Sequence, residues 1–346
     1  MKRHLNTLYI TTQGTWLNKD GENVVVSCDG AEIGRVPIHT IGAVAGFGRV
    51  LMSPQLMGYC AESGVSISFF TENGRFLARV VGPQSGNVLL RREQYRRADD
   101  EHSCMDIVKS IVAGKTLNQR AVLRRTLRDH GGKLAPDAKQ AVEAVADRLT
   151  AIARKVESQA SSDILRGLEG EAAQVYFGVF DHLIRVETAD FRFEKRSRRP
   201  PLNPVNALLS LVYALLVTDV RSALEANGLD PAVGFLYRDR PGRPSLALDI
   251  MEEFRPFFAD RLVLSLLNHR QLKLSDFKIF ENGAVLLTDE GRKTVLVAYQ
   301  ERKREELIHP FIEEKITIGL VWHVQAQLLA RHLRGDLDGY PPFIWK

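Results

Sequence analysis

Cysteine is scarce in this sequence, whose 346 residues include only Cys28, Cys60 and Cys104, and no two of them form a CxxC pair. That scarcity argues against a zinc-finger site or a disulfide framework and fits a reducing cytoplasm. Long apolar runs are also missing. The longest, residues 207–217, is too short to span a bilayer, and the N-terminus has no apolar signal region. The sequence therefore predicts a cytoplasmic protein with no membrane contact.

Length and composition indicate a globular protein of two domains. A chain of 346 residues is longer than one ordinary hydrophobic core supports. Apolar residues make up 45% and charged residues 26%, which is ordinary for a globular protein. The net charge of +5 permits nucleic-acid binding without establishing it, because clustering of charge matters more than its sum.

The pattern of apolar residues changes character near residue 82. Residues 1–82 read as short strands, with turn signals at Asp20-Gly21 and Asn73-Gly74. Glycine and proline break the pattern at 83–87, and helical periodicity follows to residue 346. We therefore predict an α+β fold with a sandwich-like, strand-rich N-terminal domain (1–82), a linker (83–87) and a larger all-α domain (88–346). Individual helices are expected near 101–114, 117–130, 136–157 and 159–185.

Two carboxylates stand on one helical face in the segment 234–256. Asp249 and Glu252 are three residues apart, among apolar neighbours that indicate a largely buried helix. Two carboxylates in such a place repel each other, and a divalent cation relieves the repulsion. A solvated acidic edge, or a carboxylate paired with Arg255, is the alternative. Pro256 predicts a kink just after the pair.

A third acid, Glu169, lies between Gly167 and Gly170 in a helical segment. Glycine costs a helix roughly 1 kcal/mol against alanine, so this pair predicts close packing of the backbone. A glutamate in such a segment is either a ligand or a structural acid.

Two basic stretches flank these acids, and both contain prolines that prevent a continuous helix. Both can contact phosphates, and both can equally be solvated loops. The stretches contribute Lys195, Arg196, Arg198 and Arg199, and Arg238, Arg240 and Arg243.

Four separated motifs resemble the CRISPR-associated integrase family, the endonuclease subunit that inserts new spacers into CRISPR arrays. The resemblance is to the branch found with type I systems, covers essentially the whole chain, and keeps the order and spacing of the motifs. It also matches the division into a β-rich and an α-helical part. The motifs are GLEGEAAQVYF, PPLNPVNALLSLVYALL, GFLYRDRPGRPSLALDIMEEFRP and VQAQLLARHLRGDLDGYPPFIW.

The resemblance implies a metal-dependent DNA enzyme. It implies that Glu169 and Glu252 hold one Mg²⁺ or Mn²⁺, with Asp249 as a further acid of the catalytic site. The family's histidine ligand falls at Tyr237, and a neutral phenol is a far poorer ligand than imidazole. The resemblance also implies a homodimer, formed through the N-terminal domain and bridged to a second dimer by a small CRISPR-associated partner subunit.

The implied chemistry is attack of a spacer-precursor 3′-hydroxyl on a phosphodiester at the edge of a CRISPR repeat in double-stranded DNA. Two other functions stay open. The first is a non-catalytic DNA-binding scaffold in which Tyr237 marks the loss of metal chemistry. The second is a metal-dependent nuclease unconnected with spacer integration.

Overall fold

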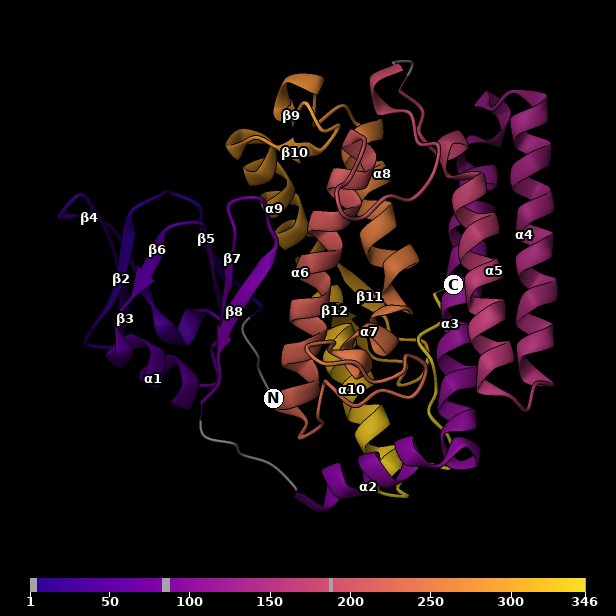
Figure 1. Cartoon of the computed structure of the whole chain (residues 1–346), viewed down its shortest axis with the longest axis horizontal. Coiled ribbons are helices and arrows are strands. Elements are labelled where there is room, and N and C mark those ends of the chain that lie inside the picture. Colours follow the sequence, from indigo (N-terminus) through magenta and orange to yellow (C-terminus); the bar gives the residue numbers. More distant parts are fainter. Residues whose placement is uncertain (1–4, 83–87, 187–188, 346) are drawn as a thin grey trace.

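A computed structural model describes residues 5–82, 88–186 and 189–345. Strands come first in the chain and helices follow, so the predicted α+β class is confirmed (Figure 1). The predicted linker, 83–87, lies outside the described residues, and the division into two domains at that point stays a prediction.

The N-terminal region contains two four-stranded sheets and one helix. One sheet has the strand order β1-β5-β7-β8 and the other the order β4-β3-β2-β6. Side chains such as Leu17, Val24 and Ile67 are buried between them. The elements are β1 Thr7–Ile10, β2 Thr15–Asp20, β3 Asn23–Cys28, β4 Ala31–Pro37, β5 Ala43–Phe47, β6 Val50–Met52, α1 Pro54–Glu62, β7 Ser66–Phe70 and β8 Phe76–Val80.

Both predicted turns of this region are present. Gly21 joins β2 to β3 with φ of 56°, and Gly74 joins β7 to β8 with φ of 81°. A positive φ is strained for residues with a side chain, which explains why the Asp-Gly and Asn-Gly pairs were informative.

Helices dominate the rest of the chain, and two short hairpins interrupt them. The pair Asn282-Gly283 predicts a hairpin within 273–290, and there β9 Phe277–Ile279 pairs with β10 Val285–Leu287. The second hairpin, in which β11 Glu306–Ile308 pairs with β12 Lys315–Thr317, was not predicted. The helices are α2 Val88–Asp99, α3 Glu101–His130, α4 Pro136–Glu157, α5 Ser162–Gly178, α6 Pro204–Ala226, α7 Ser245–Met251, α8 Arg261–Asn268, α9 Asp289–Arg304 and α10 Ile318–Leu333.

Helix α6 is the central helix of this region (Figure 1). It is long and apolar enough to cross a membrane by length and composition, but Leu208, Val212 and Leu216 are fully buried against other parts of the protein. Asn203 caps its first turn by accepting a hydrogen bond from Asn206 N. The prediction of a core helix is therefore confirmed.

One continuous helix, α3, replaces the two helices predicted at 101–114 and 117–130. The predicted break fell on a polar stretch that begins at Lys115. In the structure Lys115, Thr116, Asn118 and Gln119 are buried, so these polar residues mark an inward face of the helix and not its end. The middle of α3 therefore presents polar side chains to the interior of the helical region.

Helix α7 ends at Met251, and a π-helical turn, Arg255–Asp260, follows it. Pro256 has no N–H to donate, which favours the irregular backbone here. The regular helix is interrupted at this point, and Glu252 lies at the junction between the two segments. The predicted kink after the acidic pair stays a prediction.

Candidate active site

Glu169 points into the protein from α5. Leu165, Ala172 and Tyr176 are fully buried, and their spacing places Glu169 on the same face of the helix. The side chain of Glu169 keeps 15% exposure. It is therefore an interior acid that remains open to solvent on one side.

The glycines on either side of Glu169 do not pack against other backbone, so that expectation is wrong. A Cβ atom built on Gly167 or Gly170 meets no other atom within 4 Å. These glycines leave the surface beside Glu169 smooth and accessible.

Asp249 holds the backbone of the segment that contains Tyr237. Its Oδ2 accepts hydrogen bonds from Phe235 N at 2.6 Å and Leu236 N at 3.0 Å, and its Oδ1 accepts one from Tyr237 N at 3.0 Å. A Cβ on Gly234 would lie 2.7 Å from Oδ2, so this close approach requires glycine. Burial raises the pKa of Asp249 to about 7, although the three N–H donors act in the opposite direction.

Glu252 is fully buried and surrounded by donors. Its Oε1 accepts a hydrogen bond from the Tyr237 hydroxyl at 2.5 Å and lies 2.9 Å from a guanidinium nitrogen of Arg255. Burial alone would raise the pKa of Glu252, but Arg255 and Lys115 lower it to about 2. Glu252 is therefore an anion throughout the physiological range.

Lys115 joins the two glutamates, and the sequence did not point to it. Its Nζ lies 2.7 Å from Glu252 Oε2 and forms an ion pair with Glu169 as well. The side chain is only 5% exposed. Polar residues at 115, 116, 118 and 119 within a helical segment were the available signal.

The carboxylate oxygens of Glu169 and Glu252 supply some, but not all, of the ligands that a hard divalent ion prefers. Glu252 Oε2 is buried and receives no directed hydrogen bond from the described residues, although Lys115 lies close to it. Oxygens of Glu169 and Glu252 thus converge on one cationic position, which fits Mg²⁺ or Mn²⁺ as far as two carboxylates go. Within the described ranges, however, no group of three or more His, Cys, Asp or Glu residues has the arrangement of a metal site.

Tyr237 and Asp249 are occupied in other ways. The Tyr237 hydroxyl donates to Glu252, and burial followed by the charge of Glu252 raises the pKa of the phenol. Arg243 lies over the Tyr237 ring at 4.4 Å from its centroid. Both oxygens of Asp249 accept backbone hydrogen bonds. Their assignment as metal ligands stays a prediction, and this arrangement assigns Asp249 a positioning role.

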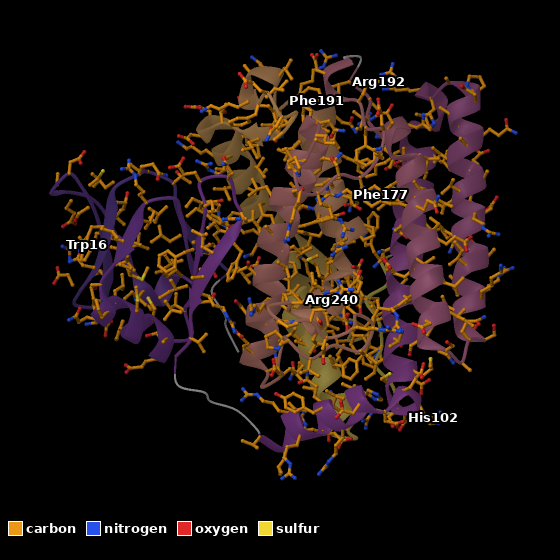
Figure 2. The ribbon with its side chains drawn as sticks, viewed as in Figure 1. Trp16, His102, Phe177, Phe191, Arg192 and Arg240 are labelled. Atoms are coloured by element: carbon orange, nitrogen blue, oxygen red, sulfur yellow. The ribbon has the colours of Figure 1, made fainter. Side chains whose placement is uncertain are left out.

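The predicted phosphate-binding residues divide into an exposed group and one inward-facing member. Arg196 donates to Asn206 Oδ1 at 2.8 Å and Ser210 Oγ at 3.1 Å and lies over the Tyr213 ring, so it anchors its loop to α6. Arg243 is partly buried against Tyr237. Arg240 is exposed on the loop before α7 (Figure 2), and Lys195, Arg198, Arg199 and Arg238 are exposed as well.

A second network surrounds Glu253, next to Glu252, and the sequence did not predict it. Glu253 accepts hydrogen bonds from Tyr340 OH at 2.7 Å, Phe343 N at 2.8 Å and Gln325 Nε2 at 3.1 Å. Burial raises the pKa of Glu253 to about 8 against these donors. The segment 340–345 therefore docks on the body of the protein.

The larger concave surfaces lie away from the carboxylates. A hollow of about 790 Å³ separates the strand region from α2 and α6, and neither Glu169 nor Glu252 lines it. A smaller one of about 220 Å³ is lined by Arg125, Arg185 and Arg261. The carboxylate cluster is thus a largely buried site, in which Glu169 keeps the most exposure.

Fold and site define an α+β protein whose helical region brings two carboxylates, Glu169 of α5 and Glu252 at the end of α7, into contact with one lysine, Lys115. The chain belongs to the family "CRISPR associated protein Cas1", whose model matches residues 8–301. It is 59% identical over 347 residues to CRISPR-associated endonuclease Cas1 2 of Rhodospirillum rubrum, and 52% identical over 346 residues to CRISPR-associated endonuclease Cas1 1 of Chlorobaculum tepidum. In both comparisons the match covers 100% of each chain.

Solved structures agree with this family. A Cas1 protein from Thermotoga maritima matches with a TM-score of 0.81 at 26% identity, over 95% of this chain and 97% of that one. A casposase bound to integration product has a TM-score of 0.81 at 21% identity, over 99% and 94%. A Cas6-RT-Cas1–Cas2 complex matches with a TM-score of 0.82 at 23% identity, over 100% of this chain and 36% of that one. The last two show likeness of fold.

Proposed function

We propose that this protein is a metal-dependent DNA endonuclease and integrase that joins the 3′ ends of spacer-precursor DNA into a CRISPR repeat, in the cytoplasm. The observation that carries the proposal is the convergence of Glu169 and Glu252, from α5 and the end of α7, on one cationic point in a chain of the Cas1 family. The side chain of Glu169 keeps 15% exposure, which leaves that point accessible from one side.

Each residue of the cluster has a proposed task. Glu169 and Glu252 hold a Mg²⁺ or Mn²⁺ ion, which when bound neutralises phosphate charge and stabilises the leaving oxygen. Arg255 fixes Glu252 through its 2.9 Å contact. Asp249 shapes the 235–237 backbone, so that the Tyr237 hydroxyl meets Glu252.

Exposed basic residues supply the proposed contacts to double-stranded DNA. Lys195, Arg198, Arg199, Arg238 and Arg240 are all exposed, and Arg243 is partly so. Contacts to phosphate position a duplex without reading its sequence and weaken steeply with salt.

The small hollow adds a basic surface that the sequence did not reveal. Among the described residues, Arg185 and Arg261 form no ion pair with an acid, and the one acid that lines this hollow, Asp129, pairs with Arg125 and Arg128. Burial, with Arg302 and Arg125 nearby, lowers the pKa of Arg261 to about 9. This excess of positive charge fits a phosphate group better than a protein carboxylate.

A homodimer and a small partner subunit complete the proposed assembly, in which the subunit bridges two dimers. Trp16 and Leu51 are register partners on β2 and β6, and they are 44% and 58% exposed. Figure 2 shows Trp16 in the strand region, away from Arg240. Exposed apolar pairs of this kind suit a protein contact. One structural neighbour is a Cas6-RT-Cas1–Cas2 complex, which supports a partner of that type.

One observation favours the scaffold as the second candidate. The Tyr237 hydroxyl and Arg255 already satisfy Glu252 Oε1, and Lys115 pairs with Oε2. A cluster with its charges balanced in this way can persist as a structural element, while the protein binds DNA and its partner.

Strand transfer of a labelled duplex into a repeat-bearing plasmid with Mn²⁺ tests these alternatives. We expect transfer by the wild-type protein and none by Glu169→Ala, with folding checked by circular dichroism. Glu171→Ala, on the exposed side of α5, is the matched control. Transfer only by Tyr237→His would support the scaffold for the natural chain, and nicking without joining would favour a plain nuclease. DNA binding without transfer or nicking in any version would refute the enzyme.

A further inference from the structure

Lys115 is delivered to the carboxylates by a rigid element. It lies in the middle of α3, and the neighbouring residues Ile111 and Val112 are fully buried. The packed helix fixes the backbone of Lys115, and the four-carbon stem extends from this fixed point. Its ammonium group therefore reaches the point between α5 and the end of α7.

The cluster is electrically neutral before any metal binds. Glu169 and Glu252 supply two negative charges, and Lys115 and Arg255 supply two positive ones. A divalent ion added to this set would leave two uncompensated positive charges beside a fully buried carboxylate, which is unfavourable in a low-dielectric interior.

The ammonium and a divalent ion also need the same atoms. Lys115 Nζ lies 2.7 Å from Glu252 Oε2, and a Mg²⁺ ion binds a carboxylate oxygen at roughly 2.0–2.1 Å. Two cations cannot occupy that space together. One of them has to leave the gap between the glutamates.

We propose that Lys115 is a built-in counter-cation of the Glu169–Glu252 pair, which a divalent ion must displace in order to bind. This inference rests on the proposed function for its ligand, but it concerns the ion alone. Lys115 holds the acids together when the ion is absent and raises the ion concentration needed for binding. Its flexible four-carbon stem lets the ammonium move aside without rearrangement of α3.

Direct binding of Mn²⁺ to metal-free protein without DNA tests the proposal, by titration calorimetry or by the electron paramagnetic resonance signal of free Mn²⁺. We expect Lys115→Met to bind Mn²⁺ at least about tenfold more tightly than wild type, equivalent to about 1.4 kcal/mol. Lys109→Met, half-buried on the same helix, is the matched control and keeps the wild-type affinity. Lys115→Arg keeps the charge and binds no more tightly than wild type.

Thermal unfolding supplies a second measurement if Lys115→Met folds poorly. Without ions, the loss of the ammonium leaves the acids repelling each other, so the Tm falls below that of wild type. Saturating Mn²⁺ then raises the Tm of this variant by more than it raises that of wild type, because the ion binds only the folded state.

An affinity for Mn²⁺ in Lys115→Met that equals or falls below that of wild type would overturn the proposal, as would an equal rise in Tm. Neither measurement depends on strand transfer. An inactive protein with the expected shift in affinity would therefore refute the proposed function alone, and an active protein without the shift would refute this inference alone.

Discussion

Glu252 and Glu253 are adjacent, fully buried carboxylates in opposite surroundings. Two cations face Glu252, and its pKa falls to about 2. Glu253 meets a tyrosine hydroxyl, an amide and a backbone N–H, and its pKa rises to about 8. Burial acts in the same direction on both, so the charge of the partners decides the outcome.

The contrast separates a site suited to chemistry from a structural joint. An anion held by movable cations can exchange them for an ion or a substrate. A carboxyl bound by neutral donors ties the 340–345 segment to the protein. Four experiments test this separation.

We expect the largest effect on stability when Glu252, the acid paired with cations, is removed. Glu252→Ala leaves Arg255 buried without its partner, and we expect a loss of about 3–5 kcal/mol in the free energy of unfolding. Urea denaturation measures it. Glu171→Ala, which breaks an exposed pair with Arg148, should cost only about 0–1 kcal/mol. Similar losses in the two variants would contradict the ionic description.

The two acids should give pH dependences of opposite sign. With a folded pKa of about 2 against the usual 4.5, Glu252 stabilises the protein above pH 4.5, and this contribution is lost as pH falls toward 2. Glu253, with a folded pKa of about 8, keeps a proton that the unfolded chain has released, so stability falls as pH rises from 4.5 to 8. Each slope approaches about 1.4 kcal/mol per pH unit.

Urea unfolding between pH 3 and 9 measures both slopes. Glu252→Gln should remove the acid-side loss. Glu253→Gln should reduce the decline toward pH 8, to which Asp249, with a pKa of about 7, also contributes. If either substitution flattened the wrong side of the profile, the assignment of the two surroundings would be reversed.

Two tyrosines offer a matched pair of smaller changes. Tyr340→Phe removes the hydroxyl bound to Glu253 Oε1, and we expect a cost of about 1–3 kcal/mol because a buried oxygen is left without that donor. Tyr237→Phe should cost about 0.5–1.5 kcal/mol, because Arg255 still contacts Glu252 Oε1. Urea denaturation ranks them, and the reverse order would count against the comparison.

Two arginines, exposed Arg240 and partly buried Arg196, give the smallest expected effects. Arg240→Gln removes an exposed charge, so stability should stay unchanged. The slope of the logarithm of DNA affinity against the logarithm of salt concentration should become shallower by about 0.9. Arg196→Gln should destabilise the loop and leave that slope intact, because its guanidinium is bound to Asn206 and Ser210. Fluorescence anisotropy at several salt concentrations checks both. Equal slopes for Arg240→Gln and wild type would remove Arg240 from the DNA-binding surface.

Local signals in the sequence explain why much of the fold was predictable. Asp20-Gly21 and Asn73-Gly74 specify turns through backbone geometry, and the α4 bounds, Pro136–Glu157, follow from apolar periodicity. Residue type and helical spacing also pointed to Glu169 and Glu252. The structure adds that both glutamates contact the same cation, Lys115.

Distant partners explain what the sequence could not provide. Lys115 pairs with Glu169 across 54 residues, and Glu253 binds Phe343 across 90. No local pattern encodes such a pairing, and polar residues within a helix look the same whether they face water or a buried acid. Arg196 was grouped with the phosphate-contacting residues for the same reason, although its guanidinium binds Asn206 and Ser210.

The docking of residues 340–345 has a consequence for folding. Asn118 on α3 accepts a hydrogen bond from Trp345 N and donates one to Phe343 O, across 227 and 225 residues of chain. Closing so long a loop is entropically costly and slow, and contacts of this range form late. Glu253 and the middle of α3 therefore reach their final arrangement near the end of folding. A partly folded chain would therefore lack the ordered carboxylate cluster.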